Sequence, residues 1–372
     1  MICPNCKHSS SNDSIFCDIC IWPLKITRYQ DFTPSELLLS FTGLISSLNE
    51  LIPNLSDPKL INKTLISYYS MFWLRPESAI LQALETECAT PFLITPEKKN
   101  ILELGCGNGL HSSLMMQWKF NESDDAYHNL NINSDDIFAS PIQNNINFNP
   151  VKKGSKIDYG IDLKLDSIIR SNKTPVFKET INADARHLPI PHNSITHIYS
   201  NLLRDFPDNI LHQTLDELKR ILTEKGKLIF IAPTENYKES LYFFPQTLLP
   251  THSKNEELHK ESFQKLDRGR SVFCQQQHSI DTWENILTIH GLKVTHYKDF
   301  CNANLLRFWD TGLRPFLPLI LPKINQLTLK EKLQLKSSLV SFYLKTTSQA
   351  FVDDLTTKEN KAFRLIIAEP IN

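Results

Sequence analysis

The 372-residue sequence predicts a doubly wound α/β sheet, because apolar strand-like runs alternate with helix-like ones and one run ends in a glycine-rich turn. That run, ILELGCGNG at residues 101–109, has three glycines at alternate positions. Glycine permits positive φ and lets a ligand approach the backbone closely. Residues 110–118 can begin a helix, whose first N–H groups would point at a ligand. This strand–turn–helix corner is where doubly wound sheets bind nucleotides.

The spacing of the glycine turn separates two classes of ligand. Dinucleotide-binding loops follow G-x-G-x-x-G, whereas this turn follows E-x-G-x-G-x-G with Glu103 two residues before the first glycine. That acid would repel a phosphate but suits an ammonium group. The alternative is that the glycine turn binds no ligand. The string resembles motif I of the class I S-adenosylmethionine-dependent methyltransferases, and Glu103 matches its acidic position. The resemblance implies that S-adenosylmethionine is bound by Glu103 and by the loop residues Gly105, Cys106, Gly107, Asn108 and Gly109.

Composition restricts the partners and the compartment. The formal net charge is −1 and the pI near 6.9, which gives no long-range attraction to nucleic acid or anionic lipid. The apolar residues 316–322 are too short and too interrupted by proline to cross a bilayer. The first residues do not read as a signal peptide. We therefore expect a cytoplasmic protein without a transmembrane segment, either free or peripheral to a membrane.

Two C-x-x-C motifs near the N-terminus predict a metal site. Four thiolates separated in this way can close a tetrahedral zinc site, which would fold a segment that lacks a core of its own. The segment resembles the short zinc ribbons of bacterial N-termini, which implies structural zinc over residues 1–25 and a role in docking to a protein partner or to its own chain. A redox role is the alternative, but no thioredoxin-like βαβ pattern surrounds either motif. The expected zinc ligands are Cys3, Cys6, Cys17 and Cys20.

Three helix starts are expected in residues 32–90, which we interpret as a helical segment packed on the core. Thr33-Pro34 begins the first, Asp57-Pro58 a second through Tyr69, and Arg75-Pro76 a third through about Cys88.

Residues 98–372 are expected to form the sheet domain, with insertions at about 119–155 and 301–360. Strands are predicted at 156–162, 194–201, 227–232, 292–297 and 362–369, and helices at 211–222 and 281–290. Residues 121–149 are dominated by Asn, Asp and Ser, with five acids and no Lys or Arg, and predict a solvated, mobile insertion. Residues 305–345 are expected to be mostly helical.

Two further acids are candidates for the cofactor site. Asp162, at the end of the predicted second strand, is placed to accept both ribose hydroxyls, with Asp158 as the alternative if that strand is misplaced. Residues 179–189 resemble the methyltransferase segment in which an Asp accepts a hydrogen bond from the adenine amino group, and Asp184 matches that position. The same resemblance implies cofactor contacts for Leu163, Ala185 and Asn201.

Residues 98–300 and the last strand resemble the ubiquinone-biosynthesis-like group of class I methyltransferases, which implies a seven-stranded Rossmann-like sheet. In these enzymes the protein mainly aligns donor and acceptor for an in-line displacement. Residues 201–207 lack both the Asn/Asp-Pro-Pro-aromatic signature and a Pro-Cys dipeptide, which leaves O-, C- or other N-methylation. His278 is a weak catalytic candidate, the alternative being a surface or capping histidine. Arg204, Asp205 and Tyr237 either touch substrate or are ordinary loop residues.

The acceptor is the least determined part of the prediction. The near-neutral charge and the apolar, aromatic residues 305–316 favour a small or lipid-linked acceptor, with that stretch as a lid or membrane contact. A helix packed on the core is the alternative for the same stretch. One alternative function is ribosomal RNA methylation, because some bacterial enzymes join a zinc ribbon to this domain, although the cysteine spacing and the charge do not favour it. Another is a cofactor-binding scaffold that acts through its zinc ribbon.

Overall fold

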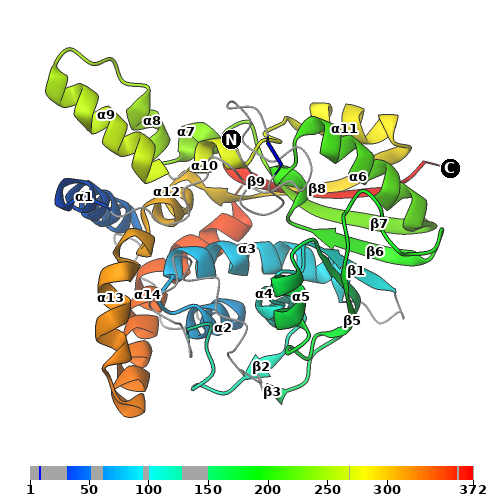
Figure 1. The fold of residues 1–372 in the computed structure, drawn as a ribbon, viewed down its shortest axis with the longest axis horizontal. Helices are drawn as coiled ribbons and strands as arrows, with labels where there is room; N and C mark the ends of the chain where they lie inside the picture. Colours follow the sequence, from blue (N-terminus) through cyan, green and yellow to red (C-terminus); the bar gives the residue numbers. More distant parts are fainter. Residues whose placement is uncertain are drawn as a thin grey trace.

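A seven-stranded mixed sheet forms the centre of the protein (Figure 1). The computed structural model describes residues 8–9, 32–51, 62–94, 100–127, 150–267, 269–357 and 360–371. The strand order is β5-β4-β1-β6-β7-β9-β8, in which β9 runs antiparallel to β7 and β8 and the other neighbours are parallel. The strands are β1 (Ile101–Leu104), β4 (Ile157–Asp162), β5 (Phe177–Asn182), β6 (Ile195–Ser200), β7 (Leu222–Pro233), β8 (Leu292–Asn302) and β9 (Lys361–Pro370). The predicted seven-stranded, Rossmann-like α/β sheet is confirmed.

Helices cover both faces of the sheet, as the doubly wound pattern requires. On one face α6 (Asp208–Ile221) and α11 (Ile280–Ile289) pack on apolar side chains of the central strands. On the other face lie α3 (Pro76–Leu93), α4 (Leu110–Met115), α5 (Leu165–Ser171) and α14 (Leu329–Thr356). Figure 1 shows α3 running across the middle of the molecule, beside the sheet. This position brings α3 close to the edge where the parallel strands end.

The N-terminal helices begin where their capping residues permit. In α1 (Pro34–Leu51) the Thr33 N–H donates to Glu36 and the Glu36 N–H donates to the Thr33 hydroxyl, as the capping pattern predicts. The predicted continuous helix from Asp57-Pro58 is wrong: Asn62 has extended backbone and caps α2 (Lys63–Met71) through the Leu65 N–H. The third helix begins at Pro76 as predicted, but it continues beyond Cys88 because Ala89 and Leu93 are still buried in the core.

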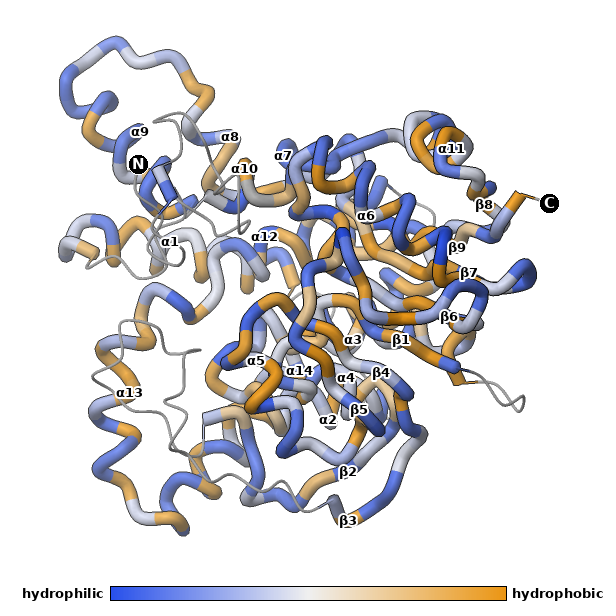
Figure 2. The backbone as a smooth tube through the Cα atoms, turned by 45° about the vertical axis from the view of Figure 1, so that its right-hand side comes forward, coloured by the Kyte–Doolittle hydropathy of each residue, from blue (hydrophilic) through white to orange (hydrophobic). Residues whose placement is uncertain are grey.

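Two helical segments interrupt the second half of the sheet. Between β7 and α11, the helices α7 (Tyr237–Ser240), α8 (Phe243–Thr247), α9 (Lys254–Asp267) and α10 (Arg270–Phe273) form an arm that projects from the sheet (Figures 1 and 2). Between β8 and β9 lie α12 (Ala303–Thr311), η4 (Arg314–Phe316), α13 (Leu317–Asn325) and α14, as the helical pattern predicts. In α12 the side chains of Leu305, Leu306 and Phe308 are buried. The apolar 305–316 stretch therefore packs largely on the core.

Part of the predicted solvated insertion is docked on the protein, so that prediction is wrong for residues 125–127, whereas Asn121 and Glu122 are exposed. The short strands β2 (Lys119–Phe120) and β3 (Pro150–Lys152) pair at its base. Trp73 donates to Asp125 through its indole N–H at 3.0 Å, and the Tyr127 ring is buried beside Trp73. These apolar and hydrogen-bonding contacts anchor a segment whose composition alone reads as solvated. Residues 128–149 lie outside the described part.

The expectations of a zinc site and of a chain without a transmembrane segment can be compared with the described residues alone. The four cysteines expected to bind zinc lie outside the described residues, and no metal-binding cluster of three or more His, Cys, Asp or Glu occurs within the described ranges. In the part of the chain that the structure covers, no helix is both long and apolar enough to span a membrane.

Candidate functional site

The glycine turn adopts the backbone that its sequence requires. Gly105, Gly107 and Gly109 have φ of +81°, +55° and +76°. A Cβ on Gly105 would lie 3.0 Å from Leu202, and one on Gly109 would lie 2.4 Å from the Thr174 hydroxyl oxygen. A Cβ on Gly107 would meet nothing within 4 Å. The first and third glycines therefore permit close packing, whereas the backbone of Gly107 faces open space that a ligand can approach.

Asp162 lies beside this open backbone. It ends β4, which pairs with β1, and its Oδ2 accepts the Gly107 N–H at 3.0 Å while its Oδ1 accepts the Lys164 N–H at 2.8 Å. Asp162 is half-buried, and each of its oxygens keeps a further lone pair. Two adjacent hydroxyl groups of a ligand could donate to these lone pairs. Asp158 lies near the opposite end of β4, where it accepts the Ile101 N–H and pairs with Lys178. This position excludes Asp158 as the alternative.

Glu103 is buried within β1, and among the described residues no cation pairs with it. The residue is 4% exposed, and its Oε2 accepts no hydrogen bond from the described part of the chain. Burial raises the pKa of Glu103 to about 8; the nearby Ser112 hydroxyl opposes this shift, and the nearby Asp162 adds to it. A carboxyl group in such surroundings suits a positively charged ligand group.

Asp184 lies at the same edge of the sheet, two residues beyond β5. The register pairs Asp162 with Asn182, so Asp162 at the end of β4 and Asp184 just after β5 lie at neighbouring strand ends. Arg186 contacts Asp184 through both its side chain, at 2.6 Å, and its backbone N–H, at 2.9 Å. Burial would raise the pKa of Asp184, but the hydrogen bonds from Arg186 outweigh burial and lower it. Asp184 is thus an ionised acceptor at neutral pH.

The remaining predicted cofactor residues surround these acids. Cys106 and Ala185 are buried, Asn201 is half-buried immediately after β6, and Asn108 and Leu163 are exposed. Burial raises the pKa of the Cys106 thiol, which removes it as a nucleophile at neutral pH. The structure brings all these positions to the carboxyl-end edge of β1, β4, β5 and β6.

Arg204 and Asp205 belong to a buried charged cluster and are not ordinary loop residues. Both lie in η3 (Leu203–Asp205), just after β6. The Arg204 guanidinium lies 3.4 Å from a Glu85 oxygen and 3.7 Å from an Asp205 oxygen, and 5.4 Å from the centre of the Phe363 ring. Burial raises the pKa of Glu85, and it raises that of Asp205 to about 7 although Arg204 opposes the shift. One cation thus serves two carboxyl groups.

Sequence reasoning missed Glu85 and a neighbouring pair, His111 and Tyr68. The Tyr68 hydroxyl lies 2.8 Å from His111 Nδ1 and 2.6 Å from the Thr86 hydroxyl. Burial, with a smaller effect of Arg204, lowers the pKa of His111 to about 4, so its ring is neutral at pH 7. The signal for Glu85 was available: it lies at helical spacing between the apolar residues Leu81 and Cys88, on a face that must be buried.

His278 and Tyr237 are held by structural contacts. His278 Nε2 lies 2.7 Å from the Gln276 side-chain oxygen, and Gln276 in turn donates to Asp208. Burial lowers the pKa of His278, and Ser279, not His278, caps α11. Tyr237 is buried and donates to the Arg270 carbonyl of the arm. A catalytic role of His278 stays a prediction.

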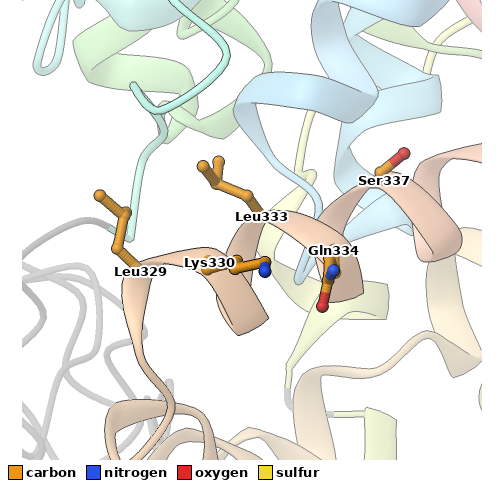
Figure 3. Close-up of a pocket in the computed structure, with 5 residues that line it drawn as sticks. All are labelled: Leu329, Lys330, Leu333, Gln334 and Ser337. Carbon is orange, nitrogen blue, oxygen red and sulfur yellow. The ribbon is translucent and has the colours of Figure 1, made fainter.

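A hollow at the start of α14 lies apart from these residues (Figure 3). It is lined by Leu329, Lys330, Leu333, Gln334 and Ser337, all from one helix. None of the residues discussed above lines it, so we do not assign it to the candidate site.

One family model matches the central segment of the chain. Residues 147–230 match the family model described as methyltransferase domain, a range that includes Asp162, Asp184 and Asn201. No curated protein sequence matches the chain. Among solved structures, it is similar to an S-adenosylmethionine-dependent methyltransferase from Mesorhizobium loti (15% identity, 77% of this chain and 99% of that one, TM-score 0.38). It is also similar to a geranyl diphosphate methyltransferase in complex with SAM (15% identity, 80% and 90% coverage, TM-score 0.36).

Proposed function

We propose that this S-adenosylmethionine-dependent methyltransferase transfers a methyl group to a small or lipid-linked acceptor. The enzyme class follows from the methyltransferase domain at residues 147–230. The observation that supports the donor site best is the open backbone of Gly107, whose N–H donates to Asp162, in the same glycine turn that follows the buried Glu103. A polar ligand with an ammonium group and a ribose fits these surroundings.

The proposed donor contacts follow from the chemistry of each group. Glu103 would bind the ammonium, Asp162 the ribose hydroxyls and Asp184 the adenine amino group. The loop residues Gly105, Cys106, Gly107, Asn108 and Gly109, with Leu163, Ala185 and Asn201, would line the rest. S-adenosylmethionine supplies an activated methyl group, so the chain has to align and desolvate the reactants.

The chain's own residues would orient the acceptor at the end of β6. Asn201 hydrogen-bonds Glu85, and Glu85 holds Arg204, so the backbone after β6 is fixed from the opposite helix, α3. A fixed loop at this position would exclude water and hold an acceptor in line with the donor. O-, C- and N-acceptors all remain compatible, and no base is assigned.

The near-zero net charge supports a small or lipid-linked acceptor over RNA. The apolar stretch 305–316 adds less support than its composition implies, because the α12 part of it is buried. To test the acceptor, the protein is incubated with methyl-labelled S-adenosylmethionine and cell extract, which is then divided into organic, small-molecule, RNA and protein fractions. Label in the organic or small-molecule fraction supports the proposal, whereas label in RNA supports the ribosomal RNA alternative. Tight cofactor binding without label in any fraction supports a scaffold.

We also propose a structural zinc ion bound by Cys3, Cys6, Cys17 and Cys20. Support comes from the two C-x-x-C motifs and from the closed, four-sulfur chemistry that they allow. Metal analysis of the purified protein should give about one zinc per chain. Replacing Cys17 and Cys20 by Ser should abolish zinc binding, while the same change at the buried Cys88 should not.

A further inference from the structure

Glu103 differs from the other acids of the site in what surrounds it. Asp162 approaches it from β4, the Ser112 hydroxyl from α4, and the phenol groups of Tyr199 and Tyr68 from β6 and α2. Cys106 of the glycine turn, also near Glu103, carries a protonated thiol. These groups are either neutral or acidic. No ion pair of Glu103 occurs in the described part of the chain.

The nearest charged cluster does not compensate Glu103. Arg204 pairs with Glu85 and Asp205, and its positive charge is already shared between them. His111, in the same helix as Ser112, is neutral because burial lowers its pKa to about 4. A buried carboxylate without a cation is unfavourable, and such a group keeps its proton. The pKa of about 8 for Glu103 agrees with this geometric argument.

We propose that Glu103 is protonated in the free enzyme and that binding of the donor's ammonium group releases one proton to solvent. The inference rests on the proposed donor site. On binding, the O–H bond of Glu103 breaks, the proton leaves to the buffer, and a carboxylate–ammonium pair forms. The proton count is the same if the complex pairs a protonated carboxyl group with a neutral amine. In either case the complex holds one proton fewer than the separate enzyme and ligand.

The proton release has a direct calorimetric signature. S-adenosylhomocysteine, which carries the same ammonium group, is titrated into the full-length protein at pH 7 in phosphate and in Tris, two buffers of different ionisation enthalpy. The difference in heat should correspond to about 0.9 proton released per ligand bound. The Kd should fall about tenfold between pH 6 and pH 7, because ionising Glu103 becomes easier as pH rises.

A control ligand isolates the ammonium group. 5′-Methylthioadenosine has the same adenosine and thioether but no amino-acid end, so its binding should release no proton. Its Kd should be the same at pH 6 and pH 7. Equal proton release with both ligands would overturn the proposal, since the proton would then come from the adenosine site.

Two matched variants identify the titrating group. Glu103→Gln keeps the size and the polarity of the side chain but cannot ionise, and S-adenosylhomocysteine should bind it more weakly, with no proton release and no dependence on pH. Asp184→Asn makes the same acid-to-amide change in a carboxylate that is already ionised, because hydrogen bonds from Arg186 lower its pKa. It should weaken binding but keep the proton release.

The outcomes separate this inference from the proposed function. No binding of S-adenosylhomocysteine to the wild-type protein would contradict the donor site itself. Binding without proton release at pH 7 would leave the donor site intact and overturn the inference. Proton release that persists in Glu103→Gln, with the variant shown folded by circular dichroism, would assign the proton to another group and equally overturn it.

Discussion

Two groups of buried acids lie close to each other at the carboxyl-end edge of the sheet, and they differ in their balance of charge. Within the ranges that the structure describes, Glu103 beside the glycine turn has no cation, whereas Glu85 and Asp205 share Arg204 on the side of α3 and η3. A buried acid that lacks a cation keeps its proton in the free protein and is able to pair with a cationic ligand group. An acid that already has a cation fixes two parts of the chain. The comparison separates a buried acid that we propose to bind the donor from buried acids whose cation joins two parts of the chain.

The largest expected effect comes from removing the shared cation. Arg204→Met should lower the free energy of unfolding by about 3–5 kcal/mol, because Glu85 and Asp205 would be left buried without compensation. Urea denaturation measures this loss. Lys178→Met removes the cation of an exposed pair with Asp158 and should cost less than about 1 kcal/mol. Similar losses in the two variants would contradict the structural role given to the Arg204 cluster.

The next largest effect is on the affinity for the donor. Asp162→Ala should weaken S-adenosylhomocysteine binding by about 1–3 kcal/mol, because the acceptor of the ribose hydroxyls and of the Gly107 N–H is removed. Calorimetry gives the change in Kd. Asp158→Ala, in the same strand but at its other end, should leave the Kd unchanged. An unaltered Kd in Asp162→Ala would mean that this strand end does not bind the ribose.

Stability of the free protein should fall as pH rises from 6.5 to 8. The folded-state pKa values of Glu103, about 8, and Asp205, about 7, lie above those of the unfolded chain, so the folded protein binds more protons in this range. His111 acts in the opposite sense only below about pH 6.5, where the unfolded chain takes up its proton. The expected loss is about 1–2 kcal/mol in urea denaturation. Glu103→Gln should reduce the loss, and an equal loss in the variant would contradict the assignment.

The smallest effect distinguishes two glycines of one turn. Gly107→Ala should cost about 1 kcal/mol of stability, from positive φ alone, because its Cβ would enter open space. Gly109→Ala should cost more, since its Cβ would lie 2.4 Å from the Thr174 hydroxyl oxygen. Thermal melting compares the variants. If Gly107→Ala left S-adenosylhomocysteine affinity unchanged, the ligand would not approach the backbone there.

The local geometry beside Glu103 could be predicted from sequence, and the contact between Glu85 and Arg204 could not. The glycine spacing and the acid that ends a strand are local patterns, so the positive φ of Gly107 and the place of Asp162 at the end of β4 agree with the sequence, while their cofactor roles stay predictions. The Glu85–Arg204 contact joins residues 119 positions apart and depends on where α3 crosses the sheet. No periodicity in either segment encodes that placement.

Packing also explains the errors. Residues 121–127 are polar in composition, yet Tyr127 and Asp125 dock on Trp73, just after α2. The Trp73 ring offers an aromatic surface and an indole N–H. For the stretch 305–316, composition left a lid or membrane contact and a helix packed on the core both open, and the burial of the α12 side chains favours the packed helix. In both cases the composition described the segment correctly, and the partner surface decided its burial.

The position of β9 between β7 and β8 has a consequence for how the protein is made. Among the described strands, β9 is the one neighbour of β8 in the sheet, and β9 is synthesised after the whole of α12, α13 and α14. While the ribosome adds residues 303–360, β7 and β8 therefore each carry an open edge, ready to bond to a neighbouring nascent chain. Assembly of this half of the sheet has to wait for residues 361–370, so a protein stalled before them would be a substrate for chaperones.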